Sequence, residues 1–111
     1  EAYQRSCAVT GEHSLPALEA AHIKPYGDSG LQAVSNGLLL QSDLHRLFDR
    51  GYITVTTDYH IEVSPRLKEE YSNGRSYYPF YGRKLDHLPP DPADHPSRNY
   101  FLWHNENVFL T

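Results

Sequence analysis

The sequence predicts a small mixed α+β domain assembled from short elements. The chain has 111 residues, which suffice for one modest hydrophobic core but not for two. Seven glycines and eight prolines interrupt it so often that its helices and strands must be short. Both strand-like alternation and helical spacing of apolar residues occur along the chain, so both kinds of element are expected.

Two short strands are expected in the first half of the chain. Residues 1–6 have the character of a helix end, and a turn around Gly11 leads into LEAAHI, residues 18–23, which forms the first strand. Pro25 closes this strand because proline has no N–H to donate to a sheet. A loop rich in Gly, Asp, Ser and Asn follows, and residues 38–41 form the second strand.

A helix is predicted directly after the second strand. Ser42 is a favoured N-cap residue, and Asp43 suits the first turn, where the helix dipole stabilises an anion. Gly51 stands where a left-handed residue would end the helix. The expected helix therefore covers residues 43–50 and completes a strand, loop, strand and helix unit.

The second half of the chain adds a hairpin and two further helices. Alternation in GYITVTT and HIEVS predicts two strands joined around residues 57–59. Ser64, followed by a proline, predicts the start of a helix that stops at Gly74. The prolines of residues 88–96 require an extended segment. A last helix over about residues 97–108 is expected to pack back on the rest.

Charge and cysteine content exclude several classes of protein. A net charge of -4 argues against a domain that binds nucleic acid through a broad basic surface, because phosphate neutralisation is the main sequence-independent source of affinity. The single cysteine, Cys7, excludes an internal disulfide and the paired cysteines of a zinc finger, and is expected to be a small buried side chain. No apolar run approaches the roughly 18 residues of a membrane span, and the cytoplasm is the expected compartment.

The helix SDLHRLFDRG carries a pair of side chains that suits a metal ion. His45 and Asp49 stand four residues apart at the edge of the apolar stripe, where adjacent turns can hold one cation. Asp49 lies in the last turn, where the helix dipole disfavours an anion that no cation offsets. Taken alone, the pair is explained better by an i,i+4 hydrogen bond, or by Asp49 pairing with Arg46 or Arg50.

The neighbours of this pair in the sequence carry more information. His22 lies at the end of the first strand, Asn36 ends the loop, and the second strand leads into the His45 helix, so the unit can bring these side chains together. With AAHIKPY, SNGLLL and DLHRLFD in this order and spacing, residues 18–51 resemble the HNH nucleases of the ββα-metal superfamily. The resemblance extends more loosely through CAVTGE and the following hairpin.

The resemblance implies an endonuclease that hydrolyses DNA phosphodiester bonds, within a restriction or defence protein. His22 would correspond to the general base, and Asn36 to the residue that braces the loop behind it. His45 and Asp49 would correspond to the helical ligands of one divalent ion. Mixed nitrogen and oxygen ligation suits Mn²⁺, Ni²⁺ or Zn²⁺ and tolerates Mg²⁺.

The resemblance also implies how the chain is organised. The fold class is α+β, with a ββα-metal core over about residues 7–57, an additional hairpin and flanking helices. A helical, proline-rich extension covers about residues 64–111, and the whole of residues 1–111 forms one nuclease domain. Similar modules often follow a DNA-reading domain, so an upstream DNA-recognition domain is expected in the same protein.

The chain departs from the family pattern in two places, and one of them leaves the third metal ligand unidentified. Many members carry a metal-binding residue directly before the general base, where this chain has Ala21. Glu19 lies two residues earlier on the same side of the strand and is the candidate third ligand, directly or through water. Many members also carry two pairs of zinc-binding cysteines, which Cys7 alone cannot supply.

Three cations near this motif are candidates for contact with DNA phosphates: Lys24, Arg46 and Arg50. A rival hypothesis is a catalytically silent DNA-binding or structural-metal module, which the missing ligand at Ala21 favours. A toxin-like effector nuclease is a further alternative. Because enzymes that cut both strands often act as pairs, a homodimer also stays open.

Overall fold

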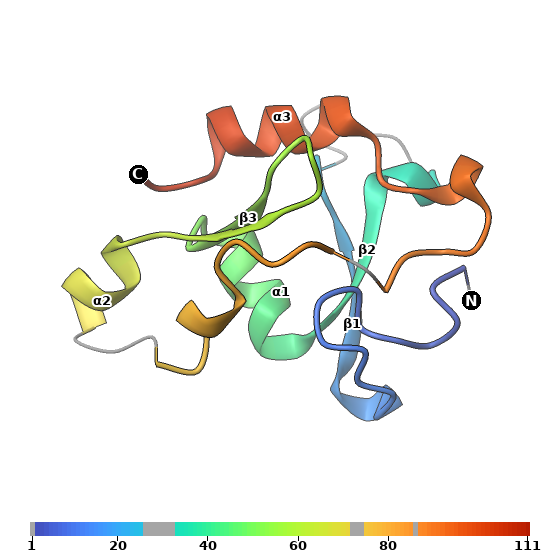
Figure 1. Cartoon of the computed structure of the whole chain (residues 1–111), viewed down its shortest axis with the longest axis horizontal. Helices are drawn as coiled ribbons and strands as arrows, with labels where there is room; N and C mark the ends of the chain where they lie inside the picture. The colour runs from blue at the N-terminus through green and yellow to red at the C-terminus, as the bar shows by residue number, and fades with distance from the viewer. Residues whose placement is uncertain (1, 26–32, 72–74, 86) are drawn as a thin grey trace.

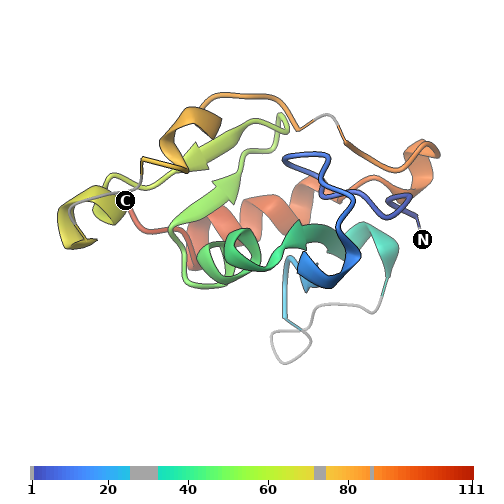
Figure 2. The ribbon, with the colours of Figure 1, turned by 90° about the horizontal axis from the view of Figure 1, so that it is seen from below.

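The computed structural model describes residues 2–25, 33–71, 75–85 and 87–111. Within this part of the chain, two separate antiparallel hairpins are combined with three α-helices, and the N- and C-termini lie at opposite ends of the molecule (Figures 1 and 2). The predicted α+β class is therefore correct. No helix in these ranges is long and apolar enough to span a bilayer. Single-turn 3₁₀ helices connect the larger elements at Leu15–Ala17, Val34–Asn36, Tyr78–Phe80 and Pro92–Asp94.

The first hairpin and the helix after it form a ββα unit. Strand β1 (Leu18–His22) pairs with β2 (Gly37–Gln41), and His22 stands opposite Gly37 in the register. Alternate residues point to opposite faces of a strand, so Ala21 lies buried in the core while His22 is exposed on the other face. Both predicted strands are confirmed to within one residue.

Helix α1 (Ser42–Asp49) follows β2 without a loop, but its start differs from the prediction. Ser42 is the first helical residue and not the N-cap, and its hydroxyl donates to the carbonyl of Ala17 at 3.1 Å, which ties the helix to the beginning of β1. The predicted end is correct. Gly51 has φ +84°, and the amide of Tyr52 donates to Leu47 O at 2.9 Å, a closure typical of a helix that ends on a left-handed glycine.

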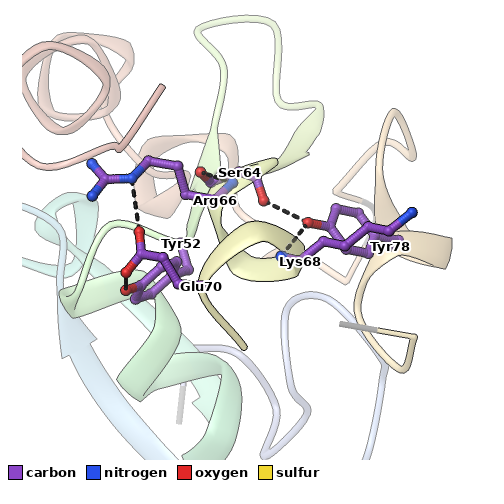
Figure 3. A network of polar contacts seen from close by, with 6 residues as sticks. All are labelled: Tyr52, Ser64, Arg66, Lys68, Glu70 and Tyr78. Carbon is purple, nitrogen blue, oxygen red and sulfur yellow. Dashed lines mark hydrogen bonds and ion pairs between the residues drawn. The ribbon is translucent and has the colours of Figure 1, made fainter. Parts of the chain in front are cut away.

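The second hairpin, β3 (Ile53–Val55) with β4 (Ile61–Val63), leads into the short helix α2 (Arg66–Tyr71). Polar contacts hold this helix, since six residues have little apolar surface to bury (Figure 3). Two tyrosines of other segments serve as anchors: the Tyr52 hydroxyl donates to Glu70, and the Tyr78 hydroxyl donates to Ser64 O. The Ser64 hydroxyl accepts from the amide of Arg66, as expected of a cap.

The N-terminal residues differ from the prediction of a helix end. Residues 2–5 form turns, and Gln4 and Arg5 have φ of 51° and 57°. A helix cannot continue through two such left-handed residues. Cys7 is fully buried, as expected of a small core side chain.

Helix α3 (Arg98–Asn107) runs along one side of the molecule and packs on β3 (Figure 1). Its buried side chains are Phe101 and His104. His104 stacks on Phe48 of α1 at a ring-centroid distance of 3.8 Å. The helix therefore packs back on the core as predicted, through an imidazole as well as through a phenyl ring.

His104 is held as a neutral ring. Its Nε2 lies 2.8 Å from the carbonyl oxygen of Phe48, which requires the proton to be on Nε2, and its Nδ1 lies 2.6 Å from the hydroxyl of Thr54. Asn105 donates to the same hydroxyl at 2.8 Å, so the hydroxyl proton is directed to Nδ1. Burial lowers the pKa of His104 to about 4.

We predict that Gly51→Ala destabilises the fold strongly. A Cβ at this position would lie 2.1 Å from Val108 O, and the residue would have to keep its positive φ. We expect a loss of about 3 kcal/mol in the free energy of unfolding, measured by urea denaturation. Gly82→Ala is the matched control, because φ is +80° there and nothing lies within 4 Å; it should lose only about 1 kcal/mol. Equal losses would contradict the proposed clash.

We predict that His104 makes the fold sensitive to acid. Between its ordinary pKa of 6.5 and the folded-state value of about 4, the unfolded chain binds more protons at this residue. The free energy of unfolding should therefore fall as the pH drops through that window, by about 3 kcal/mol in total. Urea unfolding at several pH values should show a weaker pH dependence for His104→Gln than for the wild type. The same dependence in both proteins would reject this assignment.

Candidate active site

The side chains of His22, His45 and Asp49 border one cleft of about 360 Å³. His22 comes from the end of β1, whereas His45 and Asp49 come from successive turns of α1, which packs against β1. The rest of the cleft wall is mainly apolar and comes from β1 and the segment after it and from α3 and the residue after it: Ala20, Ile23, Pro25, His104 and Val108.

The ring of His45 lies between two carboxylates. Its Nδ1 is 2.7 Å from Oε1 of Glu19, and its Nε2 is 3.0 Å from Oδ2 of Asp49. The ring is only 23% exposed, while the two carboxylates are about half exposed. Both nitrogens of one imidazole are thus directed at acceptors.

This arrangement attracts a cation. A neutral imidazole has one N–H, so when Nδ1 donates to Glu19, the bare Nε2 faces the oxygen of Asp49. Two acceptors at 3.0 Å repel each other unless a proton or a metal ion lies between them. The sequence suggested a hydrogen bond or a shared ion for His45 and Asp49, and the geometry accommodates either.

The electrostatic environment of Asp49 also agrees with the attraction of a cation to this place. Partial burial raises the pKa of its carboxyl above the ordinary value, and Glu19 acts in the same direction. His45 and His22 oppose the rise. The negative charge of Asp49 is therefore incompletely compensated by the side chains around it.

Glu19 lies on the other side of His45 from the cleft. Together with Arg46 and Arg50 it borders a second, smaller depression of about 250 Å³, which shares His45 and Asp49 with the first. An ion bound at Nε2 of His45 would be separated from Glu19 by the imidazole ring. This position suits a carboxylate that orients the histidine, not one that contacts the ion directly.

Asn36 is fully buried and braces the segment that follows His22. Its side-chain oxygen accepts from the amide of Lys24 and its side-chain nitrogen donates to the carbonyl of the same residue, both at 2.9 Å. Its own carbonyl accepts from the amide of Ile23 at 2.9 Å. These contacts fix the backbone one and two residues after His22.

The three candidate DNA-binding cations are distributed over two places. Arg46 and Arg50 lie beside the second depression. Lys24 follows the cleft residue Ile23 and places its ammonium 5.6 Å from the ring centre of Trp103.

Two cleft residues, His104 and Val108, are not predicted from the sequence, and neither is Trp103, whose ring lies beside Lys24. No local pattern marks them, because α3 and the residue after it are far from β1 and α1 in the sequence and meet them only through tertiary packing.

The donor set around His45 and Asp49 fits a divalent ion. Two cis ligands of an octahedral ion with bonds of about 2.1 Å stand about 3.0 Å apart, which is the separation of Nε2 and Oδ2. Among the described residues, no group of three or more His, Cys, Asp or Glu side chains converges on one ion position. The described part of the chain therefore offers two candidate ligands here, and water and phosphate oxygens would complete the coordination, as is common for Mg²⁺.

Comparisons with known proteins identify a similar family and a similar solved structure. Residues 7–56 match the profile of the family described as HNH endonuclease. Among solved structures, a protein described as "Modification dependent TagI restriction endonuclease" superposes with a TM-score of 0.65 at 24% sequence identity. The alignment covers 97% of this chain but 36% of that one, so this chain spans about a third of that structure. No curated protein matches the chain.

The structural likeness shows a shared α+β fold of the ββα type. The matched residues contain the whole β1, β2 and α1 unit together with β3, and so include the cleft residues His22, His45 and Asp49. The part of the chain that matches the HNH endonuclease family is therefore the part that holds these three cleft residues.

Proposed function

We propose that the chain is the catalytic domain of a metal-dependent DNA endonuclease. The observation that carries this proposal is that His22 borders the same cleft as the His45 and Asp49 pair, although they come from different elements. Phosphodiester hydrolysis needs a proton acceptor for the attacking water and positive charge near the reacting phosphate. His22 serves as the acceptor, and the pair on α1 holds the cation.

His22 has suitable surroundings for a general base. An imidazole can take a proton near neutral pH, and His22 lies within the electrostatic influence of Asp49. Asn36 acts on it indirectly, because its hydrogen bonds to Lys24 and Ile23 prevent the end of β1 from moving relative to the loop. In this proposal, Asn36 is a positioning residue.

His45 and Asp49 hold the divalent ion, Mg²⁺, Mn²⁺, Ni²⁺ or Zn²⁺. When bound, the ion supplies Lewis-acid stabilisation for the phosphate and the leaving oxygen. Glu19 accepts a hydrogen bond from Nδ1–H of His45. This bond fixes the tautomer in which Nε2 is unprotonated and faces the cleft. Glu19 therefore replaces the third ligand, which Ala21 cannot provide, with an orienting hydrogen bond.

A silent module is the second candidate function. It is favoured by the lack, among the described residues, of a third metal-binding side chain beside His45 and Asp49. Such a module would bind DNA or a structural ion without cutting. The two candidates differ in whether the chain, or the longer protein that contains it, cleaves DNA.

DNA recognition is proposed to come mainly from outside this domain. The net charge of -4 leaves little nonspecific attraction for phosphate, and the TagI protein, whose name states dependence on modification, is about three times as long as the aligned part. A DNA-reading domain in the same protein, upstream of this one, would supply the missing affinity.

We expect plasmid DNA to be cut in the presence of Mg²⁺ or Mn²⁺ and to stay intact in EDTA. His22→Ala and His45→Ala should each lower the cleavage rate at least about 100-fold, because one removes the proton acceptor and the other a metal ligand. Gel electrophoresis of supercoiled, nicked and linear plasmid measures this, with modified and unmodified DNA as substrates.

His60→Ala is the control for these variants, since His60 lies at the β3–β4 turn beside Lys84 and does not line the cleft. It should cut at the wild-type rate. Undiminished cutting by both cleft variants would reject the assigned roles. If the wild type cuts no DNA of any kind while its fold is intact, the silent module is the correct function.

We further expect Glu19 to govern metal affinity. Glu19→Ala should weaken Mn²⁺ binding about 10-fold in isothermal titration calorimetry, because His45 loses the partner that fixes its tautomer. Glu19→Gln, which can still accept a hydrogen bond, should lose less. If Glu19→Ala binds Mn²⁺ as tightly as the wild type, the orienting role is wrong. If Glu19→Ala and Glu19→Gln lose binding as completely as Asp49→Ala, Glu19 is itself a ligand.

A further inference from the structure

Lys24 is fixed at both its backbone and its side chain. Asn36 binds the amide and the carbonyl of Lys24, each at 2.9 Å, and the indole of Trp103 lies 5.6 Å from Nζ. A free lysine side chain loses rotamer entropy when it binds a ligand. Contact with the face of an indole removes part of that freedom beforehand.

The charge of Lys24 is not neutralised by an acidic neighbour. Among the described residues, no Asp or Glu forms an ion pair with it, whereas Arg98 lies 3.9 Å from Asp58 and Arg66 binds Glu70 at 2.8 Å. Arg98 also lies over an aromatic ring, that of Tyr59 at 5.2 Å, so the aromatic contact alone does not distinguish Lys24. What distinguishes Lys24 is that it has no paired carboxylate in the described part of the chain and stands between two residues that line the cleft.

Lys24 and Trp103 each stand next to residues that line the cleft. Ile23 and Pro25, on either side of Lys24 in the sequence, line the cleft that contains His22. Trp103 directly precedes His104, which lines the same cleft from α3. The segment that carries Lys24 and the helix that carries Trp103 therefore both form part of the cleft wall.

We infer that α3 is part of the substrate-binding site, because Trp103 holds the ammonium of Lys24 for contact with a DNA phosphate at the edge of the His22 cleft. The inference rests on the proposed function and adds to it a residue outside the family-matched range 7–56. Trp103 is a positioning residue in this scheme and does not contact the DNA. Lysine suits the role, since it binds phosphate as a point charge and needs no fixed bidentate geometry.

A double-mutant cycle in the His22→Ala background tests the inference without cleavage. Binding of a short fluorescein-labelled DNA duplex is measured by anisotropy over a range of KCl concentrations. Lys24→Gln should weaken binding about fivefold and lower the slope of log affinity against log salt by about 0.9, the effect of one lost phosphate contact. Trp103→Leu should weaken binding about threefold when Lys24 is present.

Coupling between the two residues is the decisive result. In the Lys24→Gln protein, Trp103→Leu should have no further effect, because the indole acts only through the lysine. Trp103→Phe, which keeps an aromatic face, should bind better than Trp103→Leu, and it provides the test if the leucine variant unfolds. Arg98→Gln is the matched control from the same helix and should bind DNA as the parent does.

Other outcomes overturn the inference in distinguishable ways. If Trp103→Leu weakens binding equally with and without Lys24, the indole contacts DNA itself. If Lys24→Gln leaves both the affinity and the salt slope unchanged, no phosphate binds there, while the cleavage assays still decide the proposed nuclease activity. If the folded His22→Ala protein binds no DNA even at low salt, the inference fails, while the proposed function, which takes most of its affinity from a DNA-reading domain, is still decided by the cleavage assays.

Discussion

The contacts at the C-terminal end of α1 determine how the elements of the molecule are arranged. The carbonyl of Phe48 accepts from the amide of Gly51 at the end of α1 and also from His104 of α3, and the carbonyl of Gly51 accepts from Leu110. Only glycine fits where the Cβ would meet Val108 O at 2.1 Å. The C-terminal part of the chain is thus locked to the same turn of α1 that carries Asp49, and α3 becomes a wall of the cleft.

A second constraint is chemical and concerns His45. One imidazole faces two carboxylates, Glu19 at Nδ1 and Asp49 at Nε2, and only one of these contacts can be an ordinary hydrogen bond of a neutral ring. The remaining contact calls for positive charge. A strand residue thereby acts on the ion position through the ring of a helix residue, and the missing family ligand at Ala21 has less consequence than the sequence alone suggests.

The charge distribution explains why cations near the cleft matter. With a net charge of -4, the domain as a whole does not attract phosphate, so each lysine or arginine that faces the substrate accounts for a large share of the attraction. Rigid placement adds to that share, because a cation that is already oriented loses less entropy on binding. Asn36 contributes in two ways. Its side chain binds the backbone of Lys24, and its main-chain carbonyl accepts from the amide of Ile23, directly after β1.

The order of β1, β2 and α1 and the common flank of His45 and Asp49 could be predicted from the amino-acid sequence, because strand alternation and helical spacing are local properties. The sequence also predicted Gly51 as the end of α1. It misplaced the N-cap of α1 and the turns of residues 2–5, where side-chain hydrogen bonds and left-handed residues override propensity. The tertiary structure was needed to place Glu19 at Nδ1 of His45, His104 in the wall of the cleft and Trp103 beside Lys24. His104 is 56 residues from Phe48, and contacts over such separations depend on packing, which no local pattern encodes.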